Sequence, residues 1–486
     1  MDILKRPMFF ASVASAFVAM ISVYSFVLAV FIAAFAVLTF IFAVVKGKFK
    51  YLPIVIIFLF FVASLLFQFK KINKINLNSG KTFYGEFTVL SEIKDCGKYV
   101  TYTLKSNSND IIPAGTKCFA FDYSGTPLNT GDIISAEIKL NAIKQDSIYR
   151  LYDYGNSVYA TATVKTVNAL NKSDVLYKTA ASIRKYIKNT VSSVADGDIA
   201  GFLLAVTTGD KSLLSDKFEN SIKSTGVSHV VVVSGMHLAI IMSALFFLTD
   251  RLFYNKYLRS FISVAAIFAI SAVCGFTMSI LRAGQMFIIA GLAPVFNREN
   301  DSLNSLLAAV TAVLAVSPFS VFNISFQLSV LSTLAIVWVA PFYFQLIVNR
   351  FKIKSRVFKV FLSAVSVSVF AMIFTMPIAV KEFGYVSLIS PVTNLLITYA
   401  VTLVLVLNIS GIILSVIPIL NILSNCVFGA AKIFATYIVF IINKISKIPV
   451  TIAILPQNSY LIFAAVIFAI IAFMYFYNFS KKRRDF

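Results

Sequence analysis

Histidine and cysteine are scarce in this chain, which has 2 histidines and 4 cysteines among its 486 residues. A metal hydrolase site takes several nitrogen or sulfur ligands close together, so these counts exclude a histidine-rich one. No CxxC pair occurs in the sequence, which gives no sign of a thiol-based metal or redox site. No Walker-type phosphate-binding loop occurs either, so any step that requires ATP hydrolysis must be carried out by a separate partner, an ATP-driven motor. We expect no metal, no cofactor and no catalytic residue, so the chain is predicted not to be an enzyme.

Charged residues are also few, at 13% against 59% hydrophobic residues, and the mean hydropathy is +0.85. This apolar content exceeds what a soluble core needs and indicates a bundle of membrane-spanning helices. The apolar stretch from Met8 to Val45 is too long for a signal peptide and lacks a cleavage site, so it is predicted to form two retained spans. A third span runs from Leu52 to Phe69. Nine apolar segments follow near 228–249, 261–280, 283–297, 303–317, 325–347, 358–379, 387–408, 420–443 and 459–478.

The expected fold is therefore an α-helical polytopic membrane protein of about 12 spans. Residues 283–317 and Ile409–Leu420 are candidates for short, broken or re-entrant helices. The net charge of +22 comes mostly from residues 227–486, which carry 18 Lys and Arg against 5 Asp and Glu. Most of these basic residues lie in short loops, as the positive-inside rule predicts for cytoplasmic loops. We therefore attribute the excess of positive charge mainly to membrane topology rather than to a DNA-binding surface. Both termini are predicted to be cytoplasmic, and residues 70–225 extracytoplasmic.

Part of the external region has the pattern of a small β domain. Five short segments of β-branched and aromatic residues are separated by turn formers, namely Thr82–Leu90, Lys98–Leu104, Thr116–Tyr123, Asp132–Leu140 and Ser157–Thr166. They predict an OB-like barrel or a small sandwich. From Thr82 to Lys165 there are 8 basic and 9 acidic residues, which gives weak support for nucleic-acid binding. The aromatic residues that could stack on bases are Tyr84, Tyr99, Tyr102, Phe119 and Tyr123.

Two cysteines, Cys96 and Cys118, fall in this external domain. An oxidising exterior permits a disulfide between them, which would close a loop of 23 residues and contribute about 3 kcal/mol. Free thiols are the alternative. Beyond the domain, Ser182–Val194, Ile199–Val206 and Ser215–Ser224 are predicted to form helices on the outer surface. The predicted organisation is 1–69 (N-terminal spans), 70–171 (OB-like domain), 172–226 (interfacial helices), 227–480 (channel domain) and 481–486 (basic tail).

Both histidines lie where a polar run enters a long apolar segment. His229 and His237 are eight residues apart, about 80° around an ideal helix, and Ser234 neighbours His237. Gly235 permits a kink. Imidazoles and hydroxyls here could line a hydrated path or bridge helices. A Ser234–His237 nucleophile pair is a further interpretation, but no acidic residue in the segment would orient it.

Two cations and two amides fall within apolar segments. Arg282 and Lys432 are predicted to face the bundle interior or a water-filled path, where they would lower the cost of moving a polyanion. The alternatives are snorkelling to the interface or pairing with a distant acid such as Asp210 or Glu382. Gln327 and Asn394 are candidates to line the same path or to bridge helices.

A set of ordered motifs runs through the second half of the chain: Gly209–Ser215, Thr225–His229, Val233–Leu238, Ser279–Ala283, Ser317–Phe319, Ile324–Ser329, Met376–Pro377 and Phe383–Asn394. Together they resemble the signature of the ComEC-type competence membrane proteins, and the external domain resembles that family's OB-like domain. The residues that carry the resemblance are Gly209, Asp210, Gly226, Ser228, Gly235, Ser325, Phe326, Pro377 and Pro391.

The resemblance implies an inner-membrane channel that conducts single-stranded DNA into the cytoplasm during natural transformation. It also implies a separate DNA receptor, nuclease and motor. Many family members continue into a C-terminal metallo-β-lactamase-like domain, but the sequence contains no HxHxDH motif. We therefore expect either a short family member or a truncated chain, in both cases without that nuclease. A secondary transporter of a small anion and an intramembrane hydrolase are the alternative functions.

Overall fold

The computed structural model describes residues 7–24, 32–33, 37, 52–91, 93–108, 111–143, 150–231, 233–292, 301–448 and 452–484. The second predicted span lies almost entirely outside the described residues, as do the two ends of the chain. The chain forms two compact units. The first comprises residues 1–185, 268–286 and 307–326, and the second comprises residues 186–267, 287–306 and 327–486. Each unit is described by itself below.

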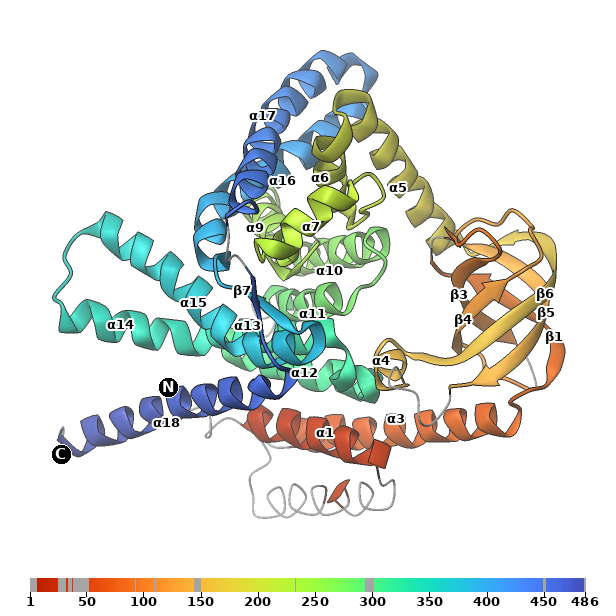
Figure 1. The fold of residues 1–486 in the computed structure, drawn as a ribbon, viewed down its shortest axis with the longest axis horizontal. Helices are drawn as coiled ribbons and strands as arrows, with labels where there is room; N and C mark the ends of the chain where they lie inside the picture. The colour runs from red at the N-terminus through yellow and green to blue at the C-terminus, as the bar shows by residue number, and fades with distance from the viewer. Residues whose placement is uncertain are drawn as a thin grey trace. The chain divides into compact units, whose positions relative to one another are not determined.

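The first unit contains a closed β-barrel (Figure 1). Its five main strands pair in the order β1-β5-β6-β4-β3 and close through β1–β3. The β4–β6 pair is parallel and the other pairs are antiparallel. This is the Greek-key arrangement of an OB-like barrel, so the barrel rather than the sandwich is confirmed. The strands are β1 (Thr82–Val89), β3 (Val100–Ser108), β4 (Lys117–Asp122), β5 (Asp132–Ala142) and β6 (Val158–Ser173), with a short β2 (Lys94–Asp95) at the edge.

Alternation along most of the strands fills the barrel. Phe87, Leu104, Ile134 and other inward residues are fully buried, while most of their neighbours in sequence are more exposed. One polar pair shares this interior. The Tyr102 hydroxyl donates to Asp122 Oδ2 at 2.8 Å, and burial together with this carboxylate raises the pKa of Tyr102.

The first unit also contains helices α1 (Pro7–Tyr24), α3 (Leu52–Leu77) and α4 (Arg150–Gly155). Helix α4 packs on the 3-10 turn η3 (Pro318–Phe322), and the residues after α4 make polar contacts with the ends of this turn. Asn323 donates to Asn156 Oδ1 at 2.7 Å, and the Ser157 and Ser317 hydroxyls lie 3.0 Å apart. A Cβ at Gly155 would lie 2.7 Å from the Asn323 nitrogen, so only glycine permits this approach. Helices α11 (Met278–Leu292) and α12 (Ser302–Val316) each contribute part of their length to this unit.

The second unit is a helical bundle around the α16–α17 hairpin. Phe428 packs against Gly411, where a Cβ would lie 2.9 Å from the ring, so the helices approach closely. Helix α6 packs on both members of the hairpin, and α9 packs on α16. The helices that lie wholly in this unit are α6 (Gly197–Thr208), α7 (Asp216–Ser224), α8 (Ser228–Val231), α9 (Gly235–Leu252), α14 (Ala340–Arg350), α15 (Arg356–Phe383), α16 (Ser390–Ser415), α17 (Asn421–Ile445) and α18 (Tyr460–Arg484). Five more contribute only part of their length, namely α5 (Val175–Val194), α10 (Lys256–Val273), α11, α12 and α13 (Ile324–Leu334).

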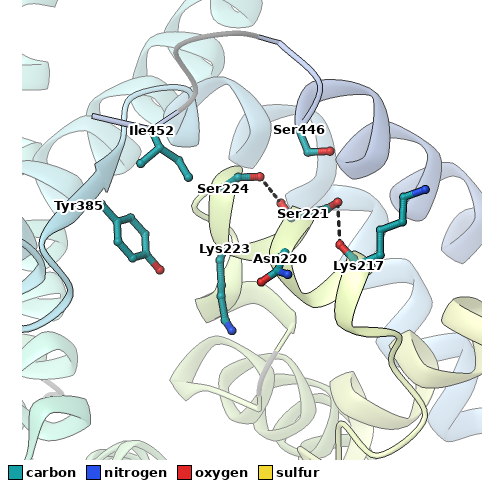
Figure 2. A pocket seen from close by; sticks show the side chains of 8 residues that line it. All are labelled: Lys217, Asn220, Ser221, Lys223, Ser224, Tyr385, Ser446 and Ile452. Carbon is teal, nitrogen blue, oxygen red and sulfur yellow. Dashed lines mark hydrogen bonds between the residues drawn. The ribbon is translucent and has the colours of Figure 1, made fainter. Parts of the chain in front are cut away.

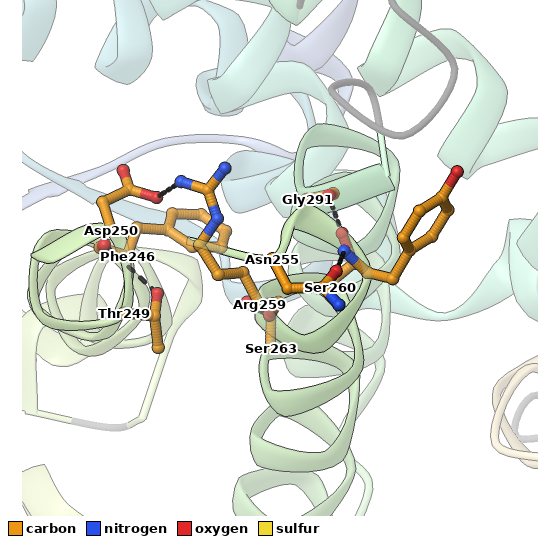
Figure 3. A network of polar contacts seen from close by, with 9 residues as sticks. Phe246, Thr249, Asp250, Asn255, Arg259, Ser260, Ser263 and Gly291 are labelled. Atoms are coloured by element: carbon orange, nitrogen blue, oxygen red, sulfur yellow. Dashed lines mark hydrogen bonds and ion pairs between the residues drawn. The ribbon is translucent and has the colours of Figure 1, made fainter. Parts of the chain in front are cut away.

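The connection between α9 and α10 carries one of the predicted basic loops (Figure 3). Arg259 forms an ion pair with Asp250, and the Ser260 hydroxyl donates to the Gly291 carbonyl at 2.7 Å. Arg251 lies over the Phe247 ring, 4.3 Å from its centroid. These contacts fix the turn, and the loop carries a net positive charge.

Eight helices in the described part of the chain are long and apolar enough to cross a membrane. Helices α11 and α12 have only 15 residues each, which confirms the expectation of short helices within 283–317. Helix α13 continues into α14 through a π-helical turn, Ala335–Val339, which precedes Pro341. A proline lacks the N–H of a regular helix turn, which accounts for this irregularity. The protein is a multi-pass membrane protein.

Candidate functional site

The first family-like motif is a turn that ends α6. Gly209 caps the helix in the left-handed region, with φ +84°, and donates its N–H to the Ala205 carbonyl. Asp210 Oδ1 accepts the Ser212 N–H at 2.7 Å, and its other oxygen lies 3.8 Å from Lys188 Nζ. Gly209 and Asp210 therefore fix the path of the chain between α6 and α7. Their observed contacts are structural.

In the second motif, the backbone closely approaches two serine side chains. Gly226 has φ +70°, and a Cβ on it would lie 2.7 Å from the Cβ atoms of both Ser387 and Ser390. The Ser390 hydroxyl donates to the Gly226 carbonyl at 3.1 Å. Only glycine combines this backbone conformation with this approach. The motif at 225–229 is thus locked to the segment that leads into α16.

The histidines do not lie on one continuous helix, so the 80° estimate does not apply. The chain leaves helical geometry after Val231, and α9 starts at Gly235 with Ser234 as its N-cap. His237 Nδ1 accepts the Ser234 N–H at 3.2 Å and lies 2.9 Å from Ser234 Oγ. His237 is thus the third residue of a capping box, with imidazole in the place of the usual Glu or Gln.

The far side of His237 is not accounted for by this cap. The residue is 0% exposed, and its Nε2 forms no hydrogen bond of good geometry within the described ranges, although the Val230 backbone lies near enough to interact with the ring. Buried polar atoms are nearly always paired with protein or with water. His229 differs from it, because this residue is exposed to solvent.

Helix α16 adds further polar atoms of the same kind. Asn394 Nδ2 donates to Ser390 Oγ at 3.3 Å, while Asn394 Oδ1 is buried without a partner among the residues that the structure describes. The same is true of Ser387 Oγ. Ser390 therefore connects Gly226 to Asn394, and two buried oxygens are left available, Asn394 Oδ1 on α16 and Ser387 Oγ on the segment that precedes it. Pro391 lies in the first turn of this helix, where its missing N–H costs nothing.

Sequence reasoning missed Asn408, in the middle of α16. It is 0% exposed, and its amide donates to the Leu203 carbonyl at 3.1 Å and to Thr207 Oγ1 at 2.7 Å. These bonds fasten α16 to α6 next to the Gly209 turn. The available signal was a lone amide within a long apolar run, which in a membrane helix marks an interhelical contact or a polar path.

Two of the predicted path residues are not joined to this polar cluster. Lys432 is exposed, and its ammonium lies 3.5 Å from the Val194 carbonyl, at the C-terminus of α5 (Val175–Val194). A cation there complements the helix dipole. Arg282 is 4% exposed in the first unit, and its Nη1 lies 3.2 Å from Met286 Sδ.

The remaining predicted residues lie on α13 and α15. Gln327 is half-buried near the start of α13. Phe326 is buried, and its N–H donates to Asn323 Oδ1 at 2.9 Å, whereas Ser325 is exposed. Pro377 lies inside α15. These positions are accounted for by capping and packing.

A shallow pocket of 430 Å³ lies beside the 225–229 motif (Figure 2). Its polar lining comes from one face of α7 and from Tyr385, which faces that helix across the pocket. Lys223 also lies 3.5 Å from Glu219, so its charge is partly compensated. The lining residues are Lys217, Asn220, Ser221, Lys223, Ser224, Tyr385, Ser446 and Ile452.

Cys96 and Cys118 are both free thiols. Cys118 lies opposite Leu104 of β3. Cys96 follows β2, whose last residue pairs with Val100, four residues before Leu104 on the same strand. Four residues along a strand correspond to about 13 Å, roughly twice the Cα separation that a disulfide allows. Burial raises the pKa of the Cys118 thiol to about 12. The register therefore explains why the two thiols are separate.

Comparisons with known proteins agree with the positions of these motifs. A profile of the family described as "Competence protein" matches residues 206–479. The chain is also similar to ComE operon protein 3 of Bacillus subtilis (strain 168), at 22% identity over 267 residues. That alignment covers 55% of this chain but 33% of the relative, so the chain matches about a third of that protein's length. No solved structure matches it significantly. Because the profile covers more than half of the chain, from the end of α6 into α18, this protein belongs to the competence protein family.

Proposed function

We propose that this protein acts in DNA uptake and conducts single-stranded DNA across the cell membrane into the cytoplasm during natural transformation. Its path runs through the second unit, past the break between α8 and α9 and the first turns of α16. The residues assigned to it are His229, Ser234, His237 and Asn394. We add Ser387, which lies in one of the family-like motifs but was not predicted from the sequence to line the path.

One observation carries this proposal. His237 Nε2, Ser387 Oγ and Asn394 Oδ1 are buried polar atoms without a well-formed hydrogen bond in the described part of the second unit, and all three lie in family-like motifs. Asn408 Oδ1 is a fourth such atom and lies outside those motifs. Leaving such atoms unpaired in a bilayer costs about 1–3 kcal/mol each. Water or a passing polar substrate would remove that cost, and this is the expected lining of a hydrated path.

The lysine-lined pocket beside α7 supports the same direction of transport. If residues 70–225 are extracytoplasmic, Lys217 and Lys223 lie on the outer side, where they would attract phosphates before entry. Within the first unit, buried Arg282 would stabilise a polyanion by charge or by a bidentate contact. Gln327 and Lys432 remain candidates of lower rank, because their observed positions are half-buried and exposed. A DNA receptor, a nuclease for the other strand and an ATP-driven motor would be separate proteins.

Deletion and complementation in a transformable host test the proposal. Deletion should abolish transformation by naked DNA while growth and the uptake of small anions stay normal, and the intact gene should restore it. Normal transformation in the deletion strain would overturn the DNA channel. A selective loss of small-anion uptake would instead support the secondary transporter.

A further inference from the structure

The barrel has a net charge near zero, but its charged and aromatic residues are unevenly distributed over its outer surface. Outward residues on β1 and β5 include Glu86 and Glu137, and Glu137 pairs with Lys165 at 3.8 Å. The outer face formed by β3, β4 and the first half of β6 has a different composition, and its register can be read directly from the strand pairings. This face carries aromatic rings, hydroxyls and lysines.

A row of four aromatic rings runs along the edge of this face. Phe119, Phe121 and Tyr123 alternate with buried residues of β4, so all three point outward. The centroids of Phe119 and Phe121 are 5.2 Å apart, those of Phe121 and Tyr99 5.8 Å, and those of Tyr99 and Tyr123 5.4 Å. Phe119 is 37% and Tyr123 58% exposed. Contiguous exposed rings of this kind are costly in water and are suited to stacking on planar ligands.

The structure also corrects the set of aromatics that the sequence suggested for stacking. Tyr102 points into the barrel, where it bonds Asp122. Tyr84 lies on β1, away from the row, and its hydroxyl donates to Glu137 at 3.2 Å. Tyr99, Phe119 and Tyr123 remain, and Phe121 joins them. The sheet register thus selects four rings.

Hydroxyl groups line both sides of the aromatic row. Phe119 is opposite Thr103 on β3 and Thr161 on β6. Phe121 is likewise opposite Thr101 and Thr163. Threonine hydroxyls beside stacked rings can donate hydrogen bonds to phosphate or sugar oxygens. The row therefore lies between two sets of donors.

Lysines gather at one end of the row. Lys105 and Lys117 are directly opposite each other across β3 and β4, and like charges in that position repel. The pKa of Lys117 is lowered by its burial and by Lys105. Lys71 approaches the same end, 3.4 Å from the Gly115 carbonyl. Neither Lys105 nor Lys117 forms an ion pair with any described residue, so a bound anion would relieve the repulsion.

We propose that this aromatic row, flanked by threonines and ending at Lys105 and Lys117, is a binding platform for single-stranded DNA. Bases stack on Phe119, Phe121, Tyr99 and Tyr123, and the backbone phosphates lie against the lysines. Double-stranded DNA presents no free base faces, so the platform selects single strands. The inference rests on the proposed function, because it names the outer site at which the transported strand first binds.

Fluorescence anisotropy with the full-length protein in detergent tests this platform. The probe is a labelled oligothymidine of about 12 nucleotides, within the range that one OB fold covers. The double variant Phe119→Ala/Tyr123→Ala should bind it roughly 10–100-fold more weakly, since each stacked base contributes substantially. Tyr84→Ala is the matched control, because it removes an equally exposed aromatic from the opposite side of the barrel and should leave binding unchanged.

An abasic oligomer of the same length separates stacking from charge. The aromatic variant should bind it as the wild type does, whereas Lys105→Gln/Lys117→Gln should weaken both probes alike. The lysine variant should also reduce the slope of log K against log salt by about 0.7 per lysine. Melting temperatures of all variants report whether the barrel is intact.

Equal binding of oligothymidine by wild type and aromatic variant, or equal losses in the variant and in Tyr84→Ala, would overturn the platform. Either result leaves the channel proposal standing as long as deletion of the gene still abolishes transformation. Conversely, a confirmed platform with normal transformation after deletion would overturn the channel alone.

Discussion

The barrel and the helical bundle differ in how fully their buried polar atoms are paired. In the barrel, the buried Asp122 carboxylate is satisfied by the Tyr102 hydroxyl and by the Ser124 N–H at 2.7 Å. In the bundle, His237 and Asn394 each use one polar atom for a local contact and leave another without a partner in the described residues. The barrel strands leave one buried oxygen, Ser106 Oγ, without a partner among the described residues. The described bundle leaves four such atoms, namely His237 Nε2, Ser387 Oγ, Asn394 Oδ1 and Asn408 Oδ1, which water or substrate on the proposed path would pair.

The largest expected effect is at Gly226 in the bundle. Gly226→Ala adds a Cβ 2.7 Å from Ser387 and Ser390 in a backbone conformation that disfavours it, so it should cost about 2–4 kcal/mol and abolish uptake. Gly384→Ala is the matched control, with φ +73° but nothing within 4 Å of the new Cβ. It should cost only about 1 kcal/mol. Thermal denaturation in detergent measures both, and equal losses would show that the contact with Ser387 and Ser390 is unimportant.

The barrel supplies the next effect. Tyr102→Phe removes a hydrogen bond to the buried Asp122 carboxylate and should cost about 1.5–3 kcal/mol, seen as a lower melting temperature. Because the folded-state pKa of Tyr102 is raised, its contribution is fully present below the unfolded pKa of about 10 and is lost as pH rises above it. The variant should therefore show a shallower loss of stability above pH 10 than the wild type. Identical alkaline profiles would contradict the buried pair.

Two asparagines of α16 separate packing from path. Asn408→Leu breaks both bonds to α6 and should lower stability by about 1–2 kcal/mol. Asn394→Leu loses one weak bond at 3.3 Å and should change stability by roughly 0.5 kcal/mol, yet it should reduce DNA uptake at normal protein abundance. Uptake per molecule in the membrane distinguishes them. Normal uptake by a well-expressed Asn394→Leu protein would remove this residue from the path.

Sequence patterns predicted the parts of this fold that depend on periodicity. The five strands were predicted because inward and outward residues alternate along them. The long helices were predicted because their apolar runs are long enough to cross a bilayer. The helix break at Ser234 was missed, since a serine cap with histidine three residues later lies inside an unbroken apolar run. Asn408 was missed for a similar reason. The binding face of the barrel could not be predicted because a charge count over 84 residues is blind to strand register, which alone places Lys105 opposite Lys117.

The smallest expected effect concerns the two thiols of the barrel. Cys96 is exposed and Cys118 is buried with a pKa of about 12, so a maleimide should label Cys96 within minutes and leave Cys118 unlabelled until the barrel unfolds. Peptide mapping by mass spectrometry of intact, non-reduced protein identifies the labelled site without interference from the helical cysteines. Cys96→Ser should change the free energy of unfolding by no more than about 0.5 kcal/mol, because an exposed side chain at this turn packs against little. Its melting temperature should therefore stay close to that of the wild type. A disulfide would give the opposite result, with both thiols protected in the folded protein, both still protected after unfolding without reductant, and a measurable loss of stability in Cys96→Ser.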